Sequence, residues 1–392
     1  MDPARGAKLS TWLNDQRVRG LIYQTLLLAC VAVLAYGAIH NALANMRARG
    51  MPMGFGFWNQ VAGFDINLHL VSYSNLSTYG SAFWVGLLNT LLIAVISIPL
   101  ATLLGFVIGV ARLSPNWLLS RLALVYTSIL RNIPLLLLLL FWYNAVLKSL
   151  PGPRQSISIG DVVFLNNRGL YLPMPVPQDP AVWFIGAIVA ALLLAAGFRE
   201  WARRRQERTG AQAPVAVVAV ALIIGLPALV WAVAGAPFGF DIAKLSGFNM
   251  KGGLPIIPEM AALVFGLVTF TAAFIAEIVR AGLLAVPVGQ GEAAAALGLH
   301  RGLTMKLVVI PQAMRLITPP LTSQYLNIVK NSSLAVFIGY PDLVQIFAGT
   351  VLNQTQAAIQ VMAITMAVYL FISLAVALAL NLFNARHALK ER

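Results

Sequence analysis

Residues 292–311 read EAAAALGLHRGLTMKLVVIP, a polar, helix-forming stretch between two apolar segments. The small residues Ala293–Ala296 permit a helix that another surface can approach closely. Gly298 can end that helix and turn the chain, because glycine accepts backbone angles closed to other residues. His300 and Arg301 would give a second short helix a basic face. The stretch therefore predicts a cytoplasmic helix–turn–helix that docks on a partner.

The composition is that of a membrane protein with several spans. The chain has 392 residues, of which 59% are hydrophobic and only 10% charged, and a soluble chain needs more charge to stay dissolved. The net charge of +14 does not indicate nucleic-acid binding, because 18 of the 27 Lys and Arg fall in segments predicted to face the cytoplasm or at the cytoplasmic ends of spans, and only 7 outside. This placement follows the positive-inside rule, and anionic lipid would add attraction at the same loops.

Apolar runs of about 20 residues predict eight transmembrane helices, which makes the fold an all-α polytopic membrane protein with both termini cytoplasmic. Pro99 is expected to kink the second span, and Pro319 with Pro320 to break the seventh. Residues 148–180 and 235–256 are expected to be external loops. The predicted spans are 21–39, 82–111, 121–147, 181–198, 215–234, 257–281, 311–338 and 361–383.

Catalytic motifs are missing from the sequence. No lysine follows a glycine, so the GxxxxGK[ST] loop that holds ATP is absent. The four histidines show neither HExxH nor any other metal-ligand spacing. We therefore expect no enzyme activity, no cofactor and no metal site in this chain.

Polar residues inside predicted spans are costly, so each needs a reason. Arg131 and Asn132 lie well inside the third span. Either they face an interior cavity or gate, or residues 121–130 form an interfacial helix and the span begins later. Glu277 and Arg280 are three residues apart in the sixth span, and two interpretations stay open: a local helix pair, or Glu277 lining a solute path.

The seventh span is the least apolar. Its prolines free backbone groups that protein or water must satisfy, and broken helices of this kind often surround a substrate at mid-membrane. Hydroxyl and amide side chains in this span, with one threonine of the sixth, favour a lined pathway over a structural kink. The pathway candidates are Arg131, Asn132, Thr271, Glu277, Thr322, Ser323, Gln324 and Asn327.

These stretches together resemble the permease subunits of ATP-binding cassette (ABC) importers, in their polar amino-acid branch. Glu292-Ala293-Ala294, Gly298 and Pro311 stand at the spacing of that family's EAA loop. Further matching stretches are Phe274–Gly282, Gly289–Ala294, Lys330–Ala335 and Val85–Thr90. Arg131-Asn132-Ile133-Pro134-Leu135 is similar to the family's Arg-Gly-Thr-Pro-Leu, with Asn and Ile in place of Gly and Thr.

The resemblance implies a type I ABC importer permease core with extra helices. The eight spans are similar to those of general L-amino acid importers of Gram-negative bacteria, which implies import of L-amino acids of broad type across the inner membrane. It also implies ATPase subunits that bind ATP and Mg, a second homologous permease and a periplasmic amino-acid-binding protein. The residues that would couple to the ATPase are Glu292, Ala293, Ala294, Gly298, His300 and Arg301.

On this resemblance the chain divides into six segments. The segments are a cytoplasmic N-terminal piece (1–20), the first span with its external loop (21–81), the first part of the permease core (82–148), an external loop with an inserted helical hairpin (149–236), the second part of the core (257–384) with the coupling loop 282–310, and a cytoplasmic tail (385–392).

Two other function classes compete with this interpretation. An ion-coupled secondary amino-acid transporter would need embedded carboxylates, and apart from Glu259 at the very start of the sixth span, Glu277 is the only acidic residue within a predicted span. Such a transporter would also leave the docking loop unexplained. A membrane scaffold without a transport path would not need the polar seventh span.

Overall fold

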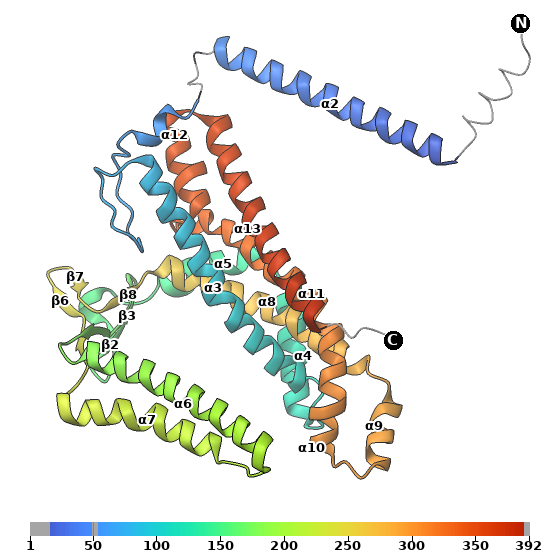
Figure 1. Cartoon of the computed structure of the whole chain (residues 1–392). Helices are drawn as coiled ribbons and strands as arrows, with labels where there is room; N and C mark the ends of the chain where they lie inside the picture. The colour runs from blue at the N-terminus through green and yellow to red at the C-terminus, as the bar shows by residue number, and fades with distance from the viewer. Residues whose placement is uncertain (1–15, 49, 51–53, 388–392) are drawn as a thin grey trace, which may run out of the picture. The chain divides into compact units, whose positions relative to one another are not determined.

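The computed structural model describes residues 16–48, 50 and 54–387, most of which are helical (Figure 1). Most of the predicted N-terminal segment and the end of the predicted tail lie outside the described residues. The main helices are α2 (Gln16–Ala48), α3 (Tyr79–Ala111), α4 (Trp117–Asn132), α5 (Leu135–Leu140), α6 (Ala181–Thr209), α7 (Val215–Ala234), α8 (Pro258–Leu284), α9 (Val288–Ala296), α10 (Arg301–Thr304), α11 (Ile310–Asn331), α12 (Leu352–Thr355) and α13 (Ala358–His387). Shorter 3₁₀ and π segments are η1 (Gly56–Asn59), η2 (Phe141–Leu147), η3 (Pro153–Gln155), η4 (Met305–Val309), η5 (Ser332–Ile338) and η6 (Val344–Val351).

The apolar helices confirm a mostly helical membrane protein with many spans. Six described helices are long and apolar enough to cross a membrane, and the bent pair of α4 with residues 135–147 makes a seventh. The predicted span 311–338 is helical as α11 and η5, but it does not reach the same apolarity because of its many polar side chains.

The expected break at Pro319 and Pro320 is wrong, because α11 continues through both prolines. Each proline lacks the N–H that a helix interior uses. Threonine side chains provide other bonds to the carbonyls in this region. The Thr318 hydroxyl donates to the Met314 carbonyl at 2.5 Å, and the Thr322 hydroxyl donates to the Thr318 carbonyl at 3.3 Å. Neighbouring hydroxyls of this kind allow proline to remain within a membrane helix.

The predicted third span is not one straight helix. Helix α4 ends at Asn132, and residues 135–147 leave it at an angle of 105°. Ile133 at the junction has extended backbone angles, as expected for a residue that precedes proline. Residues 117–147 therefore form a bent pair of helices in place of the single span predicted for 121–147.

The two segments expected to be external loops contain short strands, which the sequence analysis did not predict. The strands are β1 (Ile157–Ile159), β2 (Val163–Asn166), β3 (Gly169–Leu172), β4 (Met174–Pro177), β5 (Phe238–Asp241), β6 (Lys244–Ser246), β7 (Asn249–Lys251) and β8 (Leu254–Ile256). One antiparallel sheet has the order β1-β2-β3-β8, and β4 pairs with β5 and β6 with β7. Because β3–β8 and β4–β5 join residues on either side of α6 and α7, the inserted hairpin is closed at its base by backbone hydrogen bonds.

The described residues fall into two compact units. The first comprises the described residues among 16–89 together with 341–374, and the second comprises residues 90–340 with 375–387. In the first unit, the rings of Phe83 and Phe347 meet at 5.3 Å within an apolar core. Asn89 Nδ2 donates to the carbonyls of Leu68 at 2.8 Å and Pro341 at 2.9 Å, which ties α3 to two loops.

Asp342 is fully buried in this first unit. Its Oδ1 accepts from the Gln345 N–H at 2.8 Å and its Oδ2 from the Tyr369 hydroxyl at 3.2 Å. Burial removes the carboxylate from water and raises the pKa of Asp342 to about 7, although these hydrogen bonds act in the opposite direction.

Helix α8 is at the centre of the second unit. It packs against α4, α5 and α11 (Figure 1). Helix α3 also reaches it closely, because Gly105 and Gly109 have no side chains: a Cβ at Gly105 would lie 2.5 Å from Ile275 Cγ2, and one at Gly109 would lie 2.7 Å from Val279 Cβ. Small residues at such contacts let membrane helices approach.

Candidate functional site

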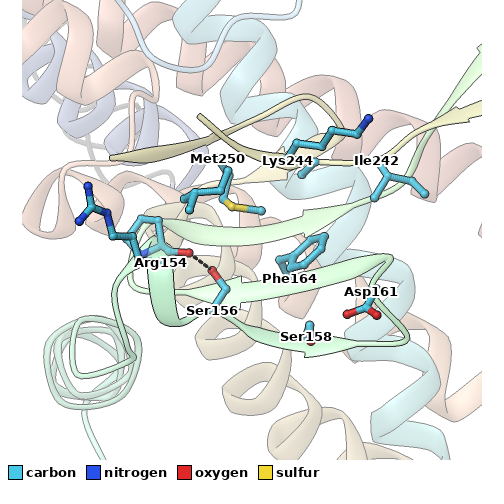
Figure 2. Close-up of a pocket in the computed structure, with 11 residues that line it drawn as sticks. Arg154, Ser156, Ser158, Asp161, Phe164, Ile242, Lys244 and Met250 are labelled. Carbon is cyan, nitrogen blue, oxygen red and sulfur yellow. Dashed lines mark hydrogen bonds between the residues drawn. The ribbon is translucent and has the colours of Figure 1, made fainter. Parts of the chain in front are cut away.

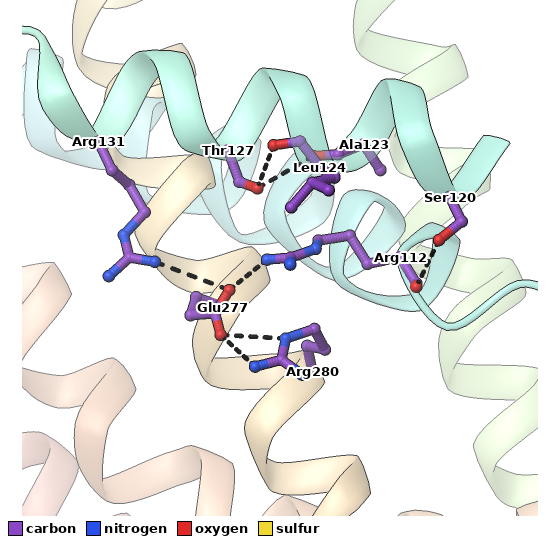
Figure 3. Close-up of polar contacts among 8 residues, drawn as sticks. All are labelled: Arg112, Ser120, Ala123, Leu124, Thr127, Arg131, Glu277 and Arg280. Atoms are coloured by element: carbon purple, nitrogen blue, oxygen red, sulfur yellow. Dashed lines mark hydrogen bonds and ion pairs between the residues drawn. The ribbon is translucent and has the colours of Figure 1, made fainter. Parts of the chain in front are cut away.

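Glu277 of α8 is surrounded by three arginines, which approach it from three sides (Figure 3). Arg280, one turn further along α8, donates from Nε at 3.0 Å and from Nη2 at 2.5 Å to Glu277 Oε1. Arg112 donates from Nη1 to Oε2. Arg131 Nη1 lies 3.7 Å from the same Oε2, which is an ion pair without a hydrogen bond. We call these four residues the Glu277 cluster.

Three elements bring the cluster together. Arg112 directly follows α3, whose glycines allow close contact with α8, and its carbonyl accepts from the Ser120 hydroxyl at 3.0 Å. Arg131 stands near the end of α4. That helix is tied to α8 where the Tyr126 hydroxyl donates to the Thr269 carbonyl at 2.7 Å. The cluster therefore depends on the packing of α3 and α4 on α8.

The charges of the cluster do not balance. One carboxylate faces three guanidinium groups, which leaves an excess of positive charge next to apolar helix surface. Both Glu277 oxygens already accept from Arg280 and Arg112. Arg131 contacts the ring of Phe274, with its Cζ 5.5 Å from the ring centroid, an arrangement that attracts a cation. Within the described part of the chain, the Arg131 guanidinium donates no hydrogen bond.

The three arginines also differ in exposure, and the arginine that donates no hydrogen bond is the most exposed. The Arg131 side chain is 42% exposed, against 29% for Arg280 and 15% for Arg112. Arg131 is thus both the least bonded and the most accessible cation of the cluster.

The structure also brings together residues that the sequence did not connect. A local Glu277–Arg280 pair was one of the two interpretations left open by the sequence, and the two side chains do form this pair. Arg112 lies between the predicted spans 82–111 and 121–147 and was not a candidate site residue. It is separated from Glu277 by 165 positions, and no spacing rule links residues so far apart. The excess of basic residues at the helix ends was the only available signal.

The other predicted pathway residues are dispersed. Asn132 is exposed, and its amide donates to the Ser128 carbonyl at 2.7 Å. Thr271 is buried in α8. On α11, Ser323 and Asn327 are exposed, whereas Thr322 and Gln324 are half-buried. No hydrogen bond or ion pair among the described residues connects these side chains with the Glu277 cluster.

The coupling-loop stretch has the predicted helix–glycine–helix form. Helix α9 ends at Ala296, Gly298 has φ of 80°, and α10 begins at Arg301 with His300 in extended conformation before it. The turn is closed where the N–H groups of Gly298 and Leu299 donate to the carbonyls of Ala295 at 2.9 Å and Ala294 at 3.1 Å. The left-handed angle at Gly298 explains why glycine is needed there.

The surface of this loop is mixed. Glu292, Ala293, His300 and Arg301 are exposed, and Ala294 is buried. Leu297 is 82% exposed at the end of α9.

A shallow hollow of about 460 Å³ lies among the short strands (Figure 2). Its charged side chains do not converge: Arg154, Asp161 and Lys244 extend toward different edges. Arg154 instead lies over the ring of Phe248 at 4.6 Å. In the described residues, no group of three or more His, Cys, Asp or Glu could hold a metal ion. The Glu277 cluster and the loop around Gly298 are therefore the better candidate sites.

Residues 101–389 match the family described as "Binding-protein-dependent transport system inner membrane component". The chain belongs to this family. Three relatives cover nearly its whole length. It is 52% identical over 375 residues to the putative amino-acid ABC transporter permease protein YhdX of Escherichia coli K12, covering 96% of this chain and 95% of the relative.

The second relative is the general L-amino acid transport system permease protein AapQ of Rhizobium johnstonii, at 46% identity over 97% of this chain and 95% of the relative. The third is the glutamate/glutamine/aspartate/asparagine transport system permease protein BztB of Rhodobacter capsulatus, at 38% identity over 100% of this chain and 98% of the relative. Family membership makes the chain a transport subunit of the inner membrane that works with a binding protein.

Proposed function

We propose that this chain is the membrane-spanning permease subunit of an ABC importer for L-amino acids of broad type. The proposal rests most directly on the loop at residues 282–310: an exposed helix, a left-handed Gly298 and a second helix, in a chain of this transport family. The names of three full-length relatives, each an amino-acid permease, support the substrate class.

The energy for transport would come from outside the chain. ATP and Mg would bind to separate ATPase subunits, which dock on Glu292, Ala293, Ala294, Gly298, His300 and Arg301. The absence of a GxxxxGK[ST] loop from the sequence agrees with this division of labour. A second, homologous permease would complete the membrane path, and a periplasmic binding protein would deliver the amino acid. Both termini would be cytoplasmic.

The path would be lined by polar side chains of α4, α8 and α11. The Glu277 cluster supplies charged groups, and α11 supplies the exposed Ser323 and Asn327 with the half-buried Gln324. The alternative of an ion-coupled secondary transporter gains no support, because the full-length relative YhdX is a putative amino-acid ABC transporter permease. In addition, Glu277 is held by arginines rather than free to exchange a proton.

Purification of the complex tests this assembly. The tagged chain would be extracted in mild detergent from cells that make it natively, and bound ATPase activity would be measured. We expect an ATPase to co-purify with the intact chain and to be lost when Glu292 is changed to Lys. A chain that carries no ATPase, yet takes up amino acids alone under an ion gradient, would contradict the proposal.

A further inference from the structure

We propose that Arg131 binds the α-carboxylate of the amino acid as it passes through the membrane. This inference rests on the proposed function and assigns a specific ligand group to one residue of the Glu277 cluster. It follows from an imbalance in the cluster, in which three guanidinium groups share one carboxylate.

The hydrogen-bond pattern singles out Arg131. Arg280 occupies Glu277 Oε1 with two bonds, and Arg112 occupies Oε2. Arg131 is left with an ion pair at 3.7 Å, too long for a hydrogen bond, and with the face of Phe274. A guanidinium carries five N–H donors in a planar fork that matches a carboxylate. Within the described residues, the donors of Arg131 have no acceptor.

The excess positive charge of the cluster also favours binding of a carboxylate. Uncompensated positive charge at a membrane helix is unfavourable unless an anion or water offsets it. Every L-amino acid presents a carboxylate, whatever its side chain. A cation that binds this shared group therefore suits a carrier of broad specificity. Glu277 already accepts hydrogen bonds from Arg280 and Arg112, so it is less available than Arg131 to bind a solute group.

The exposure of Arg131 sets it apart from the other two arginines. Its side chain is the most exposed of the three arginines, and it lies near the end of α4, just before the 105° bend. Phe274 holds one face of the guanidinium, so the fork is partly oriented before a ligand arrives. An oriented donor loses less entropy when it binds.

The test measures binding to the intact complex without its binding protein, so that recognition by that protein does not interfere. The probes are L-glutamine and L-glutaminamide, which share a side chain and differ only in the α-carboxylate. Wild type is compared with Arg131→Gln, Arg131→Lys and the control Arg203→Gln, an exposed arginine of α6. Co-purified ATPase and the melting temperature report whether each variant is assembled.

We expect wild type to bind L-glutamine more tightly than L-glutaminamide. Arg131→Gln should weaken L-glutamine binding about tenfold or more, because a charge-assisted hydrogen bond is lost, and leave L-glutaminamide binding unchanged. Arg131→Lys should retain part of the preference, and Arg203→Gln all of it. Equal binding of both probes by wild type, or an unchanged preference in Arg131→Gln, would overturn the inference.

The same experiment separates this inference from the proposed function. If the complex drives ATP-dependent uptake but Arg131→Gln keeps the preference for the carboxylate, only the role of Arg131 is wrong. If the wild-type complex shows no ATP-dependent uptake of any L-amino acid, the proposed function itself is wrong.

Discussion

The backbone of Gly109 in α3 lies so close to Val279 in α8 that a Cβ at position 109 would come within 2.7 Å of the Val279 Cβ. Val279 is two residues after Glu277, and Arg112 follows Gly109 by three. The contact between these two helices therefore sets the distance over which Arg112 reaches Glu277.

Gly109→Val should separate α3 from α8. Overpacking of this kind costs about 1–3 kcal/mol, so we expect a lower melting temperature for the purified complex and a weaker Arg112–Glu277 pair. The matched control is Gly186→Val in α6, where an added Cβ meets no atom within 4 Å. Equal melting temperatures for the two variants would show that α3 and α8 are not packed as described.

Glu277→Gln should destabilise the protein, because three arginines would lose their common counter-ion. We expect a loss of about 1–3 kcal/mol, less than for a fully buried pair, since Glu277 is 25% exposed. Thermal unfolding would measure it, with the exposed Glu200→Gln as control. Adding Arg112→Gln to Glu277→Gln should restore part of the loss; no recovery would argue against the pairing of these two residues.

Gly298→Val should block coupling while leaving the spans intact. A β-branched residue is strained at a φ of 80°, and strain of order 1–3 kcal/mol would reduce the population of the docking conformer about fivefold or more. Amino-acid uptake and bound ATPase would both fall. Gly289→Val is the control, because Gly289 lies on the same loop in ordinary helical conformation with no atom near its Cβ position. Full uptake by Gly298→Val would remove the turn from the coupling mechanism.

Asp342 should make stability depend on pH. Its pKa rises from 3.8 to about 7 on folding, so the folded state holds a proton that the unfolded state releases. The stability associated with the protonated group is present below pH 4 and is lost as pH rises through about 7. Asp342→Asn should flatten this dependence by a few kcal/mol and raise the melting temperature at pH 8 relative to wild type. Identical pH profiles for the two proteins would contradict a buried, protonated Asp342.

The sequence predicted those features that depend on neighbouring residues. Apolar runs indicated the long helices, Gly298 indicated the turn between α9 and α10, and the three-residue spacing of Glu277 and Arg280 indicated a pair on one helix face. Each of these features follows from residues close together in the sequence, through the backbone angles they allow or the period of the helix.

Features that depend on distant segments were missed. The pairing of Arg112 and Arg131 with Glu277 requires α3, α4 and α8 to pack together, and the periodicity of the sequence does not show which helices are neighbours.

Two local features were missed as well. The strands are only three or four residues long, and β4 contains two prolines, which argue against a strand. Helix α11 continues past Pro319 and Pro320, although proline normally breaks a helix.

The central claim is that this chain imports L-amino acids by means of ATP hydrolysis in a partner. The most direct measurement is uptake of labelled L-glutamine into proteoliposomes that contain the purified complex and its binding protein, with ATP supplied on the ATPase side. We predict uptake that requires hydrolysable ATP and continues when a protonophore collapses the proton gradient. Uptake that proceeds without ATP and stops when the gradient collapses would contradict the account.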